Sequence, residues 1–141
     1  MQALDDLSVV IVNYNSAAVI ESCLLPLADV GSIIVVDNAS SDDSVERVRH
    51  ARPDAEIILN DTNLGYGCAV NQGFVRAKTP YTLLINPDAV LTPQAIEALV
   101  HTAKASNNSG IVAPLLFSPK RGLELELKGP HEKTQCRIDF E

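Results

Sequence analysis

Short apolar runs alternate with longer amphipathic segments along most of the chain, and this alternation predicts the fold. The runs are rich in Val, Ile and Leu and lack clean polar alternation, which is typical of parallel strands covered on both faces. They cover residues 7–12, 33–36, 56–59, 81–85 and 110–113. Apolar residues recur at helical spacing over residues 17–28, 41–51, 66–77 and 93–106. The order predicts a doubly wound, mostly parallel α/β sheet with helices on both faces and right-handed crossovers.

Two of the predicted helices begin with capping signals, and the pattern changes near the C-terminus. Ser40, with Asp43 three residues later, resembles a capping box, and Thr92-Pro93 gives an N-cap residue followed by proline at the first helical position. Strict alternation over residues 123–127 and 136–140, with a Gly-Pro pair between, predicts a hairpin. We therefore predict an α/β domain over residues 1–116 and a C-terminal β-hairpin or tail over residues 117–141.

Each of the first four predicted strands ends in a cluster of polar residues. These clusters are Asn13-Tyr14-Asn15, Asp37-Asn38, Asn60-Asp61-Thr62-Asn63 and Asn86-Pro87-Asp88. Ligands of open parallel sheets bind beyond the carboxyl ends of the strands, so four such endings on one edge predict a binding site. Taken singly, each cluster is also what an ordinary turn uses, because Asn, Asp and Pro are favoured there.

Composition and charge limit the ligands and partners that this site would serve. The chain has 141 residues, 46% of them hydrophobic, and a formal net charge of −7. An acidic chain of this kind argues against a nucleic-acid partner. Strand ends and helix N-termini suit phosphate nevertheless, and a divalent cation held by Asp88 would supply the positive charge that the chain lacks. No apolar run approaches the roughly 20 residues of a transmembrane helix, so we expect a cytoplasmic protein without a transmembrane segment.

Several common sequence motifs are absent, which narrows the function further. The first strand-to-helix turn contains no glycine, so a redox dinucleotide fold is disfavoured. Gly65 and Gly67 begin a G-x-G pattern, but Val70 stands where the third glycine belongs. There is no P-loop motif. The three cysteines have no paired metal spacing and receive no chemical role.

Four motifs together resemble the nucleotide-sugar-binding half of a family 2 glycosyltransferase of the GT-A fold, and rhamnosyltransferase-like members most of all. They are VVIVNYN at residues 9–15, IVVDNASSD at 34–42, NLGYG at 63–67 with NQG at 71–73, and LINPDA at 84–89. Each motif alone is weak, but the four in this order and spacing are specific. The resemblance covers roughly residues 7–114.

The resemblance implies a role for each matching residue. The implied nucleotide-sugar-binding residues are Val12, Asn13, Tyr14, Asp37, Asn63, Gly65, Gly67, Asn71, Asn86 and Asp88. Tyr14 would stack on a pyrimidine base, and Asp37 would accept a hydrogen bond from the base N–H. Asp88 matches the last acid of a D-x-D-like motif and would bind Mg²⁺ or Mn²⁺ on the diphosphate. Asn86 replaces the first acid of that motif and brings no charge.

The implied activity is transfer of a sugar from a nucleotide-diphosphate donor to an acceptor hydroxyl, metal-assisted and usually with inversion. The donor would be a dTDP- or UDP-sugar, dTDP-rhamnose included, and the acceptor an unknown glycan or lipid-linked molecule at the inner face of the membrane. Such reactions belong to the biosynthesis of cell-surface polysaccharides. In relatives the catalytic base belongs to a later acidic motif, and no matching Glu-Asp pair follows Pro114 in this chain.

An alternative therefore stays open beside the enzyme. The chain would then be a non-catalytic nucleotide-sugar-binding module, or a truncated remnant that lacks the base, with residues 117–141 as the start of an acceptor-binding half. A missing half would expose apolar sheet surface and favour homo-oligomers. A nucleotidyltransferase is a weaker third hypothesis. It would need a basic, glycine-rich loop after the first strand, which residues 13–17 do not provide.

Overall fold

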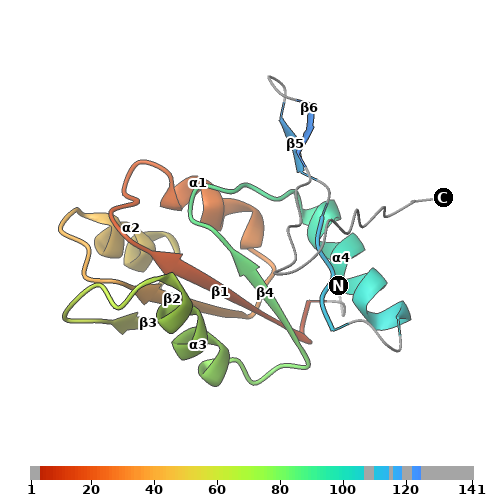
Figure 1. Ribbon diagram of the computed structural model, residues 1–141, viewed down its shortest axis with the longest axis horizontal. Helices are drawn as coiled ribbons and strands as arrows, with labels where there is room; N and C mark the ends of the chain where they lie inside the picture. The colour runs from red at the N-terminus through yellow and green to blue at the C-terminus, as the bar shows by residue number, and fades with distance from the viewer. Residues whose placement is uncertain (1–3, 107–109, 115, 119–121, 125–141) are drawn as a thin grey trace, which may run out of the picture.

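The computed structural model describes residues 4–106, 110–114, 116–118 and 122–124. Along the chain its elements are β1 Leu7–Asn13, α1 Ile20–Leu24, the 3₁₀ helix η1 Leu25–Leu27, β2 Ser32–Asp37, α2 Ser44–Ala51, β3 Glu56–Leu59, α3 Tyr66–Arg76, β4 Tyr81–Ile85, α4 Pro93–Ala105, β5 Leu116–Ser118 and β6 Gly122–Glu124. Figure 1 shows the first four strands side by side in one sheet, with the β5–β6 hairpin projecting away from it.

The main sheet is parallel throughout, in the order β3-β2-β1-β4. Pairing of Val10 with Ile34 on one side and Leu84 on the other places β1 at the centre of the sheet. Because side chains alternate along a strand, each strand contributes to two apolar cores. The structure confirms the predicted doubly wound α/β class.

The two cores place helices on both faces of the sheet. On one face, α1, η1, α2 and α4 cover the odd-numbered residues of β1 and β2, with Ile20, Leu24, Val48 and Ile96 almost completely buried. On the other face, α3 covers the even-numbered residues through Ala69 and Val70. Both layers leave the carboxyl ends of the strands accessible at one edge.

The structure confirms one of the two predicted helix caps and shortens the first predicted helix. Thr92 caps α4 as predicted, since its hydroxyl accepts a hydrogen bond from Ala95 N at 3.2 Å. The predicted capping box at Ser40 is wrong, because α2 begins at Ser44 and the Ser40 hydroxyl bonds Asp37 instead. The predicted helix over residues 17–28 is shorter, because Pro26 converts its end into η1.

One predicted strand is absent from the described structure. Residues 110–113 form no strand, and among the described residues no strand pairs with them. Ile111 is 90% exposed, so the apolar run that suggested a buried strand is not covered by any described element. A short apolar run becomes a strand only where a neighbour satisfies its backbone groups, and β4 has no described partner on this side.

The C-terminal segment is described only in part. Leu116–Ser118 pairs antiparallel with Gly122–Glu124, which gives a short hairpin. The pairing predicted between residues 123–127 and 136–140 lies largely outside the described residues. None of the helices in the described part of the chain is long and apolar enough to cross a membrane.

Candidate functional site

A solvent-open cavity of about 420 Å³ lies at the carboxyl ends of the parallel strands. Its lining comes from the segments that follow β1, β2, β3 and β4, together with the first residue of α3. The lining residues are Val12, Tyr14, Asn15, Ser16, Val19, Asn38, Asn63, Tyr66, Asn86, Pro87 and Asp88. The polar strand ends identified in the sequence therefore meet around one cavity.

The segment after β1 forms the wall that carries Tyr14. The Tyr14 side chain is 51% exposed, so a large part of its ring is available to a ligand. Asn15 adopts a left-handed conformation with φ of 50°, which turns the chain sharply. The Asn15 Oδ1 atom accepts a hydrogen bond from Ser41 N at 2.8 Å, and Asn15 N donates to the Ser40 hydroxyl at 2.9 Å. These contacts fasten the wall to the segment after β2.

Asn13 and Asp37 lie beneath this wall and do not line the cavity. They are register partners on β1 and β2, so their side chains lie on the same face of the sheet. Asn13 Nδ2 donates to Asp37 Oδ1 and to Ser44 Oγ, both at 2.7 Å. Asn13 is fully buried and Asp37 is 4% exposed. Their contacts join the two strand ends, whereas the sequence suggested that both meet the ligand.

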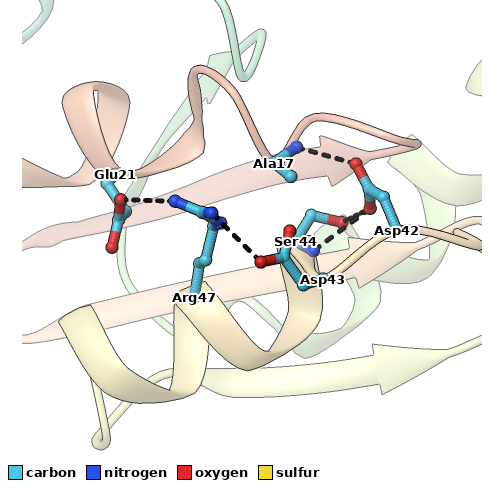
Figure 2. A network of polar contacts seen from close by, with 6 residues as sticks. All are labelled: Ala17, Glu21, Asp42, Asp43, Ser44 and Arg47. Carbon is cyan, nitrogen blue, oxygen red and sulfur yellow. Dashed lines mark hydrogen bonds and ion pairs between the residues drawn. The ribbon is translucent and has the colours of Figure 1, made fainter.

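A second network ties the same two segments together farther from the sheet. Asp42 accepts a hydrogen bond from Ala17 N at 2.8 Å, and Arg47 on α2 contacts Glu21 of α1 at 3.1 Å and Asp43 at 3.0 Å (Figure 2). The Ser44 hydroxyl bond lowers the pKa of Asp42, and Arg47 lowers that of Asp43. The ion pairs are exposed and contribute little stability, but the backbone bond to Asp42 restrains the cavity wall.

Asn38 reaches the cavity and organises the segment after β3. Its Oδ1 atom accepts from Asn60 Nδ2 at 3.0 Å and from Leu64 N at 3.3 Å, while its Nδ2 donates to Gly65 O at 3.2 Å. Gly65 has φ of +84°, a conformation that other residues rarely adopt, and precedes the first residue of α3. Asn38 thereby holds the chain in the turn that brings Asn63 to the cavity.

The segment after β4 also lines the cavity, with Asn86, Pro87 and Asp88. The Tyr66 hydroxyl donates to Asn86 Oδ1 at 3.0 Å, across from α3. The Cys23 thiol of α1 donates to Asn86 O at 3.6 Å from below. Burial, with a smaller contribution from the Asp88 carboxylate, raises the pKa of Cys23 to about 11, so this thiol is neutral at physiological pH.

The charge of the cavity lining is unusual for a site that would bind phosphate. Asp88 is the only acidic residue among the described residues of the lining, which include no lysine, arginine or histidine. In the described part of the chain, no three His, Cys, Asp or Glu side chains gather into a group able to hold a metal. Asp88 is therefore a single protein carboxylate beside a cluster of neutral amides.

Half of the residues implied by the resemblance line the cavity, and half do not. Val12, Tyr14, Asn63, Asn86 and Asp88 line it, whereas Asn13 and Asp37 lie beneath it and Gly65, Gly67 and Asn71 lie on the α3 side outside the lining. Three further lining residues, Asn15, Asn38 and Pro87, belong to the polar strand ends that the sequence marked but to which it gave no individual role. Sequence reasoning missed Ser16, Val19 and Tyr66. Of these three, Tyr66 falls within a quoted motif, Ser16 directly follows one, and Val19 lies farther along toward α1.

The comparison with family models identifies the chain. The model described as glycosyl transferase family 2 matches residues 8–135. The chain belongs to glycosyl transferase family 2. Two curated glycosyltransferases are similar to it in sequence. The low-salt glycan biosynthesis hexosyltransferase Agl10 of Haloferax volcanii is 31% identical over 138 residues, which cover 95% of this chain and 44% of the relative. The N-acetylglucosaminyl-diphospho-decaprenol L-rhamnosyltransferase of Mycobacterium tuberculosis is 28% identical over 130 residues, covering 82% and 42% respectively. The chain thus spans less than half the length of these relatives.

Solved structures show the same GT-A architecture. Glucosyl-3-phosphoglycerate synthase of Mycobacterium tuberculosis, in complex with uridine diphosphate, has a TM-score of 0.60 at 25% identity, covering 72% of this chain and 40% of that one. The same synthase is known with Mn²⁺, UDP-glucose and phosphoglyceric acid, at a TM-score of 0.58 and 26% identity over 69% of this chain and 39% of that one. TarS 1–349 of S. aureus has a TM-score of 0.64 at 21% identity, covering 79% and 39%, and supports the fold alone.

Proposed function

We propose that this family 2 chain binds a nucleotide-diphosphate sugar in the cavity at its strand ends, as the donor half of a sugar transfer to an acceptor hydroxyl. The observation that carries this proposal is the meeting of Tyr14, several amide side chains and Asp88 around one cavity at the carboxyl edge of a parallel sheet. That edge is where ligands of open α/β sheets bind. A structural neighbour with 25% identity, glucosyl-3-phosphoglycerate synthase, holds uridine diphosphate.

Base recognition is assigned to Tyr14 and Asn38 in this proposal. The half-exposed Tyr14 ring offers a stacking surface for a pyrimidine. Asp37 is buried among Asn13 and Ser40, so its proposed part is to position the two strand ends. Asn38 is the residue after β2 that lines the cavity, and the second N–H of its amide suits a carbonyl oxygen of uracil or thymine. Asn63 and the backbone at Gly65 and Gly67, with Asn71 farther along α3, border the donor beyond the base.

The lining fits a divalent metal that arrives with the donor. Mg²⁺ is usually held by one or two carboxylates and by substrate phosphates, and Asp88 provides one carboxylate. A diphosphate would otherwise enter a site without a cation among its lining residues. We therefore assign Mg²⁺ or Mn²⁺ to Asp88. When bound, the metal would stabilise the charge that develops on the leaving nucleoside diphosphate.

The finer features of the proposed reaction come from the family. They are inversion at the anomeric carbon, a dTDP- or UDP-sugar donor such as dTDP-rhamnose, and a glycan or lipid-linked acceptor at the inner face of the membrane in polysaccharide biosynthesis. Two curated relatives are a hexosyltransferase and a rhamnosyltransferase by name. An inverting transfer also needs a carboxylate to take the proton of the acceptor hydroxyl.

One observation favours a second candidate, a non-catalytic nucleotide-sugar-binding module. Asp88 is the only carboxylate that the described residues contribute to the cavity lining, and it is already assigned to the metal. None of the described lining residues is then left to act as the base. Sugar transfer that depends on an added acceptor separates the enzyme from the binding module.

Calorimetric titration of the chain with uridine diphosphate and deoxythymidine diphosphate, with and without Mn²⁺, tests the donor site. We expect Mn²⁺ to raise the affinity about tenfold or more, because it neutralises the charge between Asp88 and the diphosphate. Asp88→Ala should remove most of this gain. Asp29→Ala removes an exposed carboxylate that precedes the amino end of β2, whereas the cavity lies at the carboxyl ends of the strands, and it should leave the affinity unchanged. Equal binding with and without metal would reject the metal assignment, and absence of binding would reject the donor site.

A further inference from the structure

A hydrogen bond between two side chains of the cavity lining joins α3 to the segment after β4. Tyr66, the first residue of α3, is 50% exposed, and its hydroxyl donates to Asn86 Oδ1 at 3.0 Å. Asn86 follows the last residue of β4, so the bond joins a helix and a strand that lie on different segments of the chain. Both residues line the cavity, and the sequence singled out only one of them.

The backbone of Asn86 is held as firmly as its side chain. Its carbonyl oxygen accepts from Ala89 N at 3.0 Å and from the Cys23 thiol at 3.6 Å. With the peptide fixed from below and Oδ1 fixed from α3, the amide has little freedom to rotate. The structure shows no hydrogen bond from Asn86 Nδ2 to any of the residues it describes. The group that Asn86 offers to a ligand is therefore its NH₂.

The NH₂ group and the carbonyl oxygen of an amide bind different kinds of ligand atom. An amide oxygen can coordinate a cation, whereas an amide N–H donates to an oxygen of a hydroxyl or phosphate. The Tyr66 hydroxyl occupies one of the two lone pairs of Asn86 Oδ1 and turns this oxygen toward α3, which leaves the NH₂ group as the part of the amide that faces a ligand. Asn86 also brings no charge, unlike the acid that a D-x-D-like motif would place here.

We propose that Tyr66 is a positioning residue that fixes Asn86 as a hydrogen-bond donor to an oxygen of the bound nucleoside diphosphate, so that Asp88 alone holds the metal. This inference rests on the proposed donor site. It separates two functions within the Asn86-Pro87-Asp88 turn. Asn86 would bind the ligand independently of the metal, and Asp88 would bind it through the metal.

Titration of wild-type chain, Tyr66→Phe, Asn86→Ala and the double variant with uridine diphosphate, each with and without Mn²⁺, tests the assignment. Tyr66→Phe and Asn86→Ala should each lower the affinity about fivefold, as the loss of one neutral hydrogen bond does. The double variant should bind no more weakly than Asn86→Ala, because Tyr66 acts through Asn86. The ratio of affinities with and without Mn²⁺ should stay at the wild-type value, whereas Asp88→Ala collapses it.

Tyr81→Phe is the matched control, since it removes a tyrosine hydroxyl from the other end of β4, outside the cavity. It should bind as the wild type does. Wild-type affinity in Tyr66→Phe, additive losses in the double variant, or a changed Mn²⁺ ratio in Asn86→Ala would each overturn the inference and leave the donor site standing. A wild-type chain that binds neither uridine nor deoxythymidine diphosphate would overturn both.

A measurement on the wild-type chain tests the same inference without depending on whether the variants fold. The side-chain NH₂ signals of Asn86 in a ¹⁵N–¹H spectrum should shift when metal-free uridine diphosphate is added, because the ligand oxygen accepts from this group. Unshifted Asn86 signals at saturating ligand would overturn the inference without any substitution.

Discussion

Among the residues that the structure describes, Cys23 has a pKa that the fold shifts strongly. Its side chain is 1% exposed, and burial raises its pKa from 9.0 to about 11, with the nearby Asp88 carboxylate adding to the shift. The neutral thiol lies under the turn that carries Asp88 and donates to Asn86 O. A thiolate there would lose this donation and repel Asp88, so the site is arranged for a neutral sulfur.

The environment of Cys23 predicts that an alkylating reagent modifies it more slowly than Cys68, at a rate that depends on pH. Only the thiolate reacts with an alkylating reagent, so at pH 8 a pKa of about 11 leaves roughly one thiol in a thousand reactive. Cys68 is exposed, and we expect it to be labelled at least about a hundredfold faster than Cys23. Labelling of Cys23 should rise about tenfold for each pH unit up to about pH 10, since its thiolate fraction does, and less steeply as pH approaches the pKa of about 11.

Mass spectrometry of the peptides that contain Cys23 and Cys68 measures the two rates separately. Denatured chain is the control, because its Cys23 loses the burial that raises the pKa. Similar rates for the two cysteines in folded chain at pH 8 would contradict the described environment of Cys23.

At the residue scale, the sequence indicated which segments of the chain form the cavity better than it indicated which side chains line it. Asp37 and Asn38 are neighbours at the end of β2, and alternation along the strand sends them to opposite faces. Asp37 pairs with the buried Asn13, whereas Asn38 reaches the cavity. The resemblance favoured Asp37 because it is charged, but the register with β1 decides which of the two meets the cavity. That register is a property of two strands, so neither motif alone contains it.

At the element scale, the packing of α3 on the sheet depends on one glycine. A Cβ atom built on Gly73 would lie 2.3 Å from Val10 Cγ1, far inside van der Waals contact. Val10 is fully buried at the centre of the sheet, and its branched side chain has few alternative rotamers. The absence of a side chain at Gly73 therefore lets α3 approach β1 closely enough to bury Ala69 and Val70.

We expect Gly73→Ala to lower the free energy of unfolding by about 1–3 kcal/mol, because overpacking at Val10 outweighs the roughly 1 kcal/mol that alanine contributes in a helix. Denaturant unfolding of the wild type and the variant measures the difference. Gly67→Ala is the matched control on the same helix, since a Cβ atom there meets nothing within 4 Å. It should be neutral or stabilising.

A second substitution tests the stated cause. Val10→Ala removes the two methyl groups that collide with the new side chain, so the double variant should be more stable than the sum of the two single effects predicts. Strict additivity would mean that Gly73→Ala acts through something other than its contact with Val10.

The elements themselves were largely predictable, and the exceptions have physical causes. Four strands and four helices were predicted at or near their observed positions, because a buried parallel sheet requires apolar runs separated by amphipathic helices. Pro26 shortened the first helix, a local effect that the apolar periodicity concealed. The strand predicted at residues 110–113 does not form for a non-local reason: its apolar sequence has no strand to pair with in the described structure.

At the scale of the whole molecule, apolar surface and net charge have opposing effects on association. Several large apolar side chains are mostly exposed, among them Leu25, Val75, Val90 and Ile111 at 79%, 82%, 61% and 90%. Exposed apolar side chains favour association with other molecules or with copies of the chain. The formal net charge of −7 opposes self-association by long-range repulsion.

Salt should therefore decide the oligomeric state. The Debye length falls from about 30 Å at 0.01 M salt to about 3 Å at 1 M, so salt removes the repulsion between chains and leaves apolar contacts intact. We expect a monomer at low salt and self-association at high salt, measured by sedimentation velocity at equal protein concentration.

Val75→Glu and Ile111→Glu each replace an exposed apolar side chain by a charged one and should reduce association without lowering the melting temperature. Asp29→Asn is the charge control, since it changes the net charge by one unit and leaves every apolar side chain in place. Dissociation with rising salt would show instead that ion pairs hold the copies together, and an unchanged monomer in all conditions would show that the exposed apolar side chains are too dispersed to bind one another.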